Sequence, residues 1–227
     1  MLLHGFSSSA MINWVRYGHA FCMAACGFRV IMPDLRGHGD SSKPHNAAAY
    51  PHDVLADDGF ALIKQLGLRE YDLGGYSLGA LTVVRMLVRG AMPGRAIVAG
   101  LGLEGILNTG GRNDFFRRIL SNPGTFARGT KEWMAEAFLK TVGGDPVALL
   151  HILDTAIETS REEISQIEIP TLVVSGADDE VNVSARSLAD VLPNGHFLEV
   201  PGNHMSAVTR PELGAAIADF VGGDVMG

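Results

Sequence analysis

Short apolar runs alternate along most of this chain with longer stretches whose apolar residues recur at helical spacing. Such alternation is typical of repeated strand and helix units on a parallel sheet. The expected strands are Leu2–Leu3, Phe28–Met32, Tyr71–Gly75, Arg95–Ala99, Thr171–Ser175 and Phe197–Val200. The expected helices are Met11–Ala25, Asp53–Leu66, Leu78–Val88, Ser184–Val191 and Pro211–Val221. Right-handed crossovers would place helices on both faces, so the predicted fold class is α/β with a mostly parallel sheet.

The alternation stops between about residues 103 and 168, where the pattern is mostly helical and shows no clear strand. We interpret this stretch as a small helical lid inserted into the sheet domain. A chain of 227 residues fits one large α/β domain. The prediction is therefore a single domain over residues 1–227, with a lid insertion at about 103–168.

Charge and hydropathy exclude some functions. The formal net charge is −7, and no cluster of Lys and Arg is present to bind a nucleic acid backbone. No apolar run reaches the ~18 residues of a membrane span, and no cationic leader precedes an apolar run. Cys22 and Cys26 are expected to be reduced. We therefore expect a cytoplasmic protein with no membrane or nucleic acid partner.

The segment Gly75-Tyr76-Ser77-Leu78-Gly79 lies between a predicted strand and a predicted helix. A sharp turn there would expose the Ser77 hydroxyl at the end of the strand, where a nucleophile is needed. The start of the helix would direct free backbone N–H groups to the same place. A purely structural turn is the alternative, because the chain contains 28 glycines.

A serine nucleophile also needs a base and a carboxylate that orients the base. His204 fits the base best, because it lies in a turn-rich loop between the last predicted strand and the last predicted helix. Asp178 and Asp179 follow the strand Thr171–Ser175, and Glu104 follows an earlier strand. The pattern of residues alone leaves all three acids open.

Four motifs in sequence order resemble those of the α/β-hydrolase superfamily, in its lid-bearing esterase, lactonase and haloperoxidase-like branch. They are His4-Gly5-Phe6, Asp34–Ser41, Gly-Tyr-Ser77-Leu-Gly, and Gly176-x-x-Asp179 followed by Gly202-Asn-His204. The resemblance implies Ser77 as nucleophile, Asp179 as the acid and His204 as the base. It also implies an oxyanion hole formed by the backbone N–H groups of Phe6 and Leu78, and it implies no cofactor and no metal.

The same resemblance implies hydrolysis of a small-molecule acyl or ester substrate through an acyl-enzyme intermediate. Lactonase, thioesterase, C–C bond hydrolase and peracid-forming activities would use the same residues. A non-catalytic ligand-binding or scaffold protein with this fold is an alternative of another class. Both readings predict the same fold, so they differ only in the chemistry of Ser77.

The resemblance departs from the family pattern at the N-terminal end. Family members usually have a hairpin and a full strand before the His-Gly motif, whereas three residues precede His4 here. Either the start is truncated, or the sheet is trimmed and exposes an edge strand that must be covered. A homo-oligomer is one way to cover such an edge.

Overall fold

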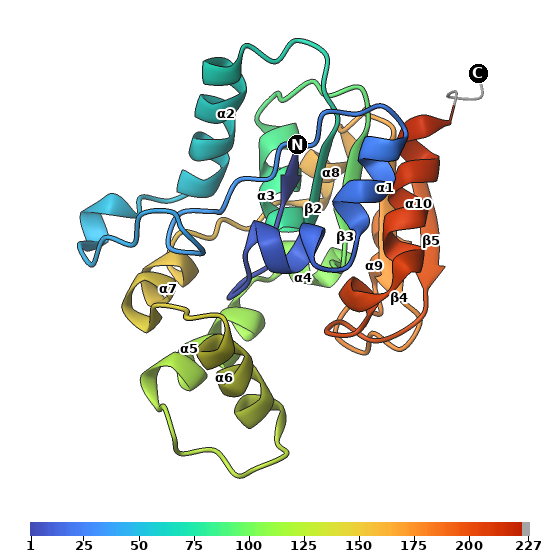
Figure 1. Ribbon diagram of the computed structural model, residues 1–227. Helices are drawn as coiled ribbons and strands as arrows, with labels where there is room; N and C mark the ends of the chain where they lie inside the picture. Colours follow the sequence, from blue (N-terminus) through green and yellow to red (C-terminus); the bar gives the residue numbers. More distant parts are fainter. Residues whose placement is uncertain (224–227) are drawn as a thin grey trace.

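The computed structural model describes residues 1–223. Its centre is a five-stranded sheet in the order β1-β2-β3-β4-β5, in which every pair of neighbours is parallel (Figure 1). The strands are β1 (Leu2–Leu3), β2 (Leu73–Tyr76), β3 (Ala96–Ala99), β4 (Thr171–Gly176) and β5 (Gly195–Val200). The predicted α/β class and parallel sheet are confirmed.

Helices cover both faces of the sheet, because side chains alternate between the two faces of a strand. Val98 of β3 belongs to a core with α2 (Val54–Leu66), α3 (Leu78–Val88) and α9 (Ala185–Val191). Its neighbour Ile97 belongs to a second core. That core holds apolar residues of α1 (His19–Ala25) and α10 (Pro211–Gly222), which pack together on the opposite face (Figure 1).

Several predicted elements begin or end one or two residues away from the observed ones, and two differ in kind. The helix expected over Met11–Ala25 is divided into a π-helical turn, Met11–Val15, and α1. Gly18 lies between them with φ of +83°, a left-handed conformation that ends a right-handed helix and that glycine adopts readily. The prediction of one continuous helix over Met11–Ala25 is therefore wrong.

The strand expected over Phe28–Met32 does not form. That segment is extended beside β1, and the Leu2 N–H donates a hydrogen bond of 2.8 Å to the carbonyl of Ile31. Since β1 has only two residues, it offers too few backbone groups for a regular ladder. The outer side of β1 is nevertheless lined by this chain's own residues, so the edge is not left bare.

Five helices occupy the interval between β3 and β4. They are α4 (Leu103–Leu107), α5 (Gly110–Ser121), α6 (Lys131–Thr141), α7 (Pro146–Leu153) and α8 (Arg161–Ser165). Local signals fix some of their starts: Asp145 caps α7 before a proline, and Ser160 and Glu163 form a capping box on α8. Helix α5 packs against both α6 and α7, and these helices project beyond the sheet (Figure 1). No helix within residues 1–223 is both long enough and apolar enough to cross a membrane.

Candidate active site

Ser77 lies on the turn between β2 and α3. Its backbone has φ of 53° and ψ of −108°, a conformation that costs free energy in any residue with a side chain. Its N–H donates to the carbonyl of Ala99 at 2.8 Å, which ties the turn to β3. The strained turn between a strand and a helix is the geometry that presents a serine hydroxyl in the nucleophile elbow.

Glycines on either side of Ser77 allow this turn to form. A Cβ at Gly75 would collide with the backbone of Gly79 and lie 2.5 Å from the Ala80 nitrogen. A Cβ at Gly79 would lie 2.5 Å from the carbonyl carbon of Leu3. The first glycine lets β2 meet α3, and the second lets α3 meet the end of β1. The spacing Gly-x-Ser-x-Gly is thus a packing requirement of the elbow.

His204 and Asp179 meet at the same end of the sheet. The His204 Nδ1 lies 3.2 Å from the Asp179 Oδ2, and the carboxylate side chain is almost fully buried while the imidazole is one quarter exposed. Burial alone would raise the pKa of Asp179, but hydrogen bonds from His204 and Asn182 hold that pKa below its usual range. The carboxylate is therefore charged at neutral pH and favours the Nδ1-protonated form of His204.

Asn182 is a member of this site that the sequence did not reveal. Its Nδ2 donates to the Asp179 Oδ2 at 2.8 Å, and its Oδ1 accepts from the Gly102 N–H at 3.1 Å. The second bond fixes which way the amide points. Asn182 thus anchors the acid to the loop after β3, and it carries no motif by which sequence alone could single it out.

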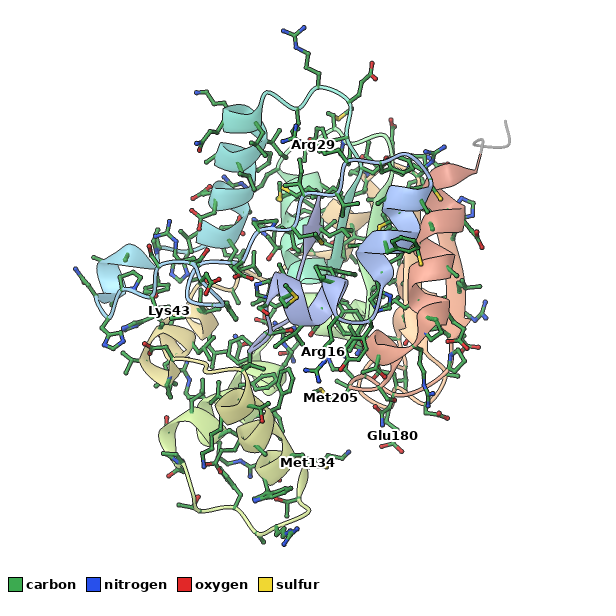
Figure 2. The ribbon with its side chains drawn as sticks, viewed as in Figure 1. Arg16, Arg29, Lys43, Met134, Glu180 and Met205 are labelled. Atoms are coloured by element: carbon green, nitrogen blue, oxygen red, sulfur yellow. The ribbon has the colours of Figure 1, made fainter. Side chains whose placement is uncertain are left out.

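The loop that carries His204 is hydrogen-bonded to Tyr76, the residue before Ser77. The Tyr76 hydroxyl donates to the carbonyl of His204 at 2.5 Å, and the two rings are 5.5 Å apart. Glu180 follows Asp179 and Met205 follows His204. Figure 2 shows these two exposed residues at the same end of the molecule. Within residues 1–223 the Ser77 hydroxyl makes no hydrogen bond; catalytic hydrogen bonds are often long in ligand-free proteins and tighten when substrate binds.

Phe6 and Leu78, the expected oxyanion donors, flank Ser77 from two elements. A Cβ placed on Gly5 would lie 3.6 Å from the Ser77 Cβ, so the loop after β1 passes close to the elbow. Leu78 is the first residue of α3. In the part of the chain that the structure describes, neither backbone N–H has a protein acceptor. Both donors therefore remain available for a ligand.

Asn13 holds the loop after β1 in place. Its Oδ1 accepts from the Gly5 N–H at 3.0 Å, and its side chain is buried with the Nδ2 unpaired within residues 1–223. The residue supports the peptide next to Phe6. Sequence reasoning passed over it, because a single asparagine in a helical pattern gives no functional signal.

Within residues 1–223, the His204 imidazole pairs with the carboxylate of Asp179 and with neither of the alternative acids. Glu104 is exposed on α4, and Asp178 is exposed beside the buried Asp179. Asp34 instead accepts hydrogen bonds from the Ala10 and Asp40 N–H groups at 2.7 and 2.8 Å. That carboxylate holds the loop Asp34–Ser41 in place.

The helical insertion lies over the site. Phe116 of α5 packs against Phe6 with ring centroids 4.6 Å apart, and Lys131 at the start of α6 lies 3.7 Å from Glu180 in the acid loop. Among residues 1–223, no three His, Cys, Asp or Glu side chains are grouped so as to hold a metal ion. The Ser77 hydroxyl, the His204 imidazole and the free N–H groups of Phe6 and Leu78 thus lie at one end of the sheet beneath a helical cover.

The parallel sheet, the elbow at Ser77 and the paired His204 and Asp179 define a protein of the hydrolase class. The model of the alpha/beta hydrolase family matches residues 1–217. The chain belongs to the alpha/beta hydrolase family.

Individual relatives agree with this assignment. The chain is 30% identical over 218 residues to "Putative non-heme bromoperoxidase BpoC" of Mycobacterium tuberculosis, covering 83% of this chain and 80% of the relative. A bromoperoxidase from Bacillus anthracis superposes with a TM-score of 0.72 at 24% identity, covering 98% and 91% of the two chains. An esterase from Exiguobacterium antarcticum gives a TM-score of 0.78 at 18% identity, covering 98% and 91%. The two solved structures show the fold, while the family model and the curated relative support a hydrolase.

Proposed function

We propose that this protein is a serine hydrolase that cleaves an ester-type carbonyl. The observation that carries the proposal is the contact between His204 and the buried Asp179, at the same end of the sheet as the strained Ser77. The buried carboxylate needs hydrogen-bond donors, and Asn182 supplies one of them. The other partner is an imidazole that is partly open to solvent, which is the arrangement expected when an acid orients a general base.

In the proposed reaction, His204 Nε2 removes the proton from the Ser77 hydroxyl as the oxygen attacks the carbonyl carbon. The N–H groups of Phe6 and Leu78 donate to the oxyanion that develops, and His204 returns the proton to the leaving group. Water activated by the same imidazole then releases the acyl group. The negative charge of Asp179 stabilises the imidazolium in both steps. No step requires a cofactor.

A serine-directed fluorophosphonate tests this proposal by intact mass. We expect one adduct on the folded wild-type protein and none on Ser77→Ala. Ser175→Ala is the matched control, since it removes another buried hydroxyl, from β4, and should keep the adduct. A folded wild type that gains no adduct, or a Ser77→Ala variant that still gains one, contradicts the proposal.

The name of the Mycobacterium tuberculosis relative favours a second outcome on the same acyl-enzyme. If hydrogen peroxide attacks the acyl group in place of water, the product is a peracid, which oxidises bromide. Monitoring bromination with acetate and peroxide would detect it, and Ser77→Ala should abolish the reaction.

A further inference from the structure

A cavity lies beneath the helical insertion, against the side of α3 that begins one residue after Ser77. Residues of α3 at i, i+3, i+4 and i+7 line it: Leu78, Leu81, Thr82 and Arg85. Arg112 of α5, Ile152, Leu153 and residues 155–157 contribute to the other walls. The cavity offers about 30 Å³, room for about two water molecules or for the two oxygens of a carboxylate.

Arg112 differs from the other arginines of α5. Arg117 pairs with Asp154 at 2.6 Å, and Arg118 pairs with Glu132. Arg112 is half-buried, and it makes no ion pair or hydrogen bond with any group in residues 1–223. Burial lowers the pKa of its guanidinium to about 10, so it stays charged at neutral pH.

The other charged residues of the cavity neutralise each other. Asp53 and Arg85 lie 2.8 Å apart, and both side chains are nearly buried. Arg85 also donates to the Thr159 hydroxyl at 3.1 Å. Arg112 therefore leaves the cavity with one unbalanced positive charge. A half-buried charge without a partner has lost part of its hydration, so an anion that enters the cavity would gain charge-assisted hydrogen bonds from it.

We propose that Arg112 binds a carboxylate of the substrate, so that the Ser77 site takes esters that bear a free carboxylate. Leu78 connects the Ser77 site with the cavity, because its N–H is a proposed oxyanion donor and the residue is part of the cavity lining. The carboxylate would thus lie on the elbow side of the lid. The planar guanidinium can donate two parallel hydrogen bonds to it. This inference rests on the proposed function, whose substrate class it specifies.

Binding to a Ser77→Ala background tests the inference without requiring turnover. The probes are the monomethyl esters of malonate, succinate and glutarate, with methyl 4-oxopentanoate as the neutral isostere of the succinate ester. A hydrogen-bonded charge pair predicts binding of at least one monoanion about 10- to 100-fold tighter than the ketone ester by calorimetry. Adding Arg112→Met should remove that preference, Arg112→Lys should keep part of it, and Arg117→Met, on the same helix, should keep all of it.

Two results overturn the inference: no preference for a monoanion of any of the three lengths, or an equal loss of preference in the Arg112→Met and Arg117→Met proteins. The proposed function fails separately, through the absence of a fluorophosphonate adduct on the wild-type protein. If the adduct forms, the ratio of kcat/KM for monomethyl succinate to that for methyl 4-oxopentanoate should fall about 10- to 100-fold in Arg112→Met.

Discussion

Replacing Gly79 with alanine should separate the two halves of the proposed oxyanion hole. The new Cβ would lie 2.5 Å from the carbonyl carbon of Leu3 and 2.8 Å from the carbonyl oxygen of His4. Ordinary van der Waals contact begins near 3.4 Å. Either β1 or α3 must therefore move by about 1 Å to accommodate the methyl group. A displacement of this size costs ~100-fold in rate when it misplaces reacting groups. Both clashing groups are backbone atoms, which no rotamer change can withdraw.

Two effects on stability compete in Gly79→Ala. Alanine favours a helix over glycine by about 1 kcal/mol, whereas overpacking a tight contact costs about 1–3 kcal/mol or more. We expect the clash to win, with a lower Tm and kcat reduced about 100-fold on a 4-nitrophenyl ester.

Gly111→Ala in α5 is the matched control for that variant. A Cβ there meets no atom within 4 Å, so it should keep the rate and the Tm. The reasoning is refuted if Gly79→Ala also keeps the wild-type rate and melts no lower than wild type.

Three further predictions concern other parts of the site. Asn13→Leu leaves the buried Gly5 N–H without its acceptor. We expect the free energy of unfolding to fall by about 1–3 kcal/mol and kcat to fall as well. If neither the free energy of unfolding nor kcat changes, Asn13 does not hold the loop after β1. Asp179→Asn should reduce kcat on the order of 10⁴-fold while Glu104→Gln stays close to wild type, and the reverse result would identify Glu104 as the acid. Burial lowers the pKa of His38 from 6.5 to about 3. As pH drops from about 6.5 toward 3, the unfolded chain therefore binds the proton first and the free energy of unfolding should fall. Urea titrations at pH 7 and 4 should show a smaller fall in that free energy for His38→Leu than for wild type, and an equal fall would exclude this cause.

The alternation of apolar runs predicted the sheet because each strand near the site is bounded by strong turn signals. The elbow was predictable for a similar reason, since Ser77 carries its glycines within two residues. The prediction of a strand over Phe28–Met32 was wrong because the pairing of that segment depends on the length of another segment, β1. Asn182 and Arg112 were missed because their roles come from contacts with distant residues, or from the lack of such contacts, which no local pattern records.

The order of strands in the sheet has a consequence for how the molecule assembles. Strands β1 to β5 lie side by side in the order in which they occur in the chain, so each new strand can join the one made just before it during synthesis. Ser77 would be in place once β3 has paired with β2, whereas Asp179 and His204 arrive with the last two strands. A nascent chain would therefore hold the proposed nucleophile well before its proposed base, and the proposed reactivity would begin only when the final edge of the sheet is complete.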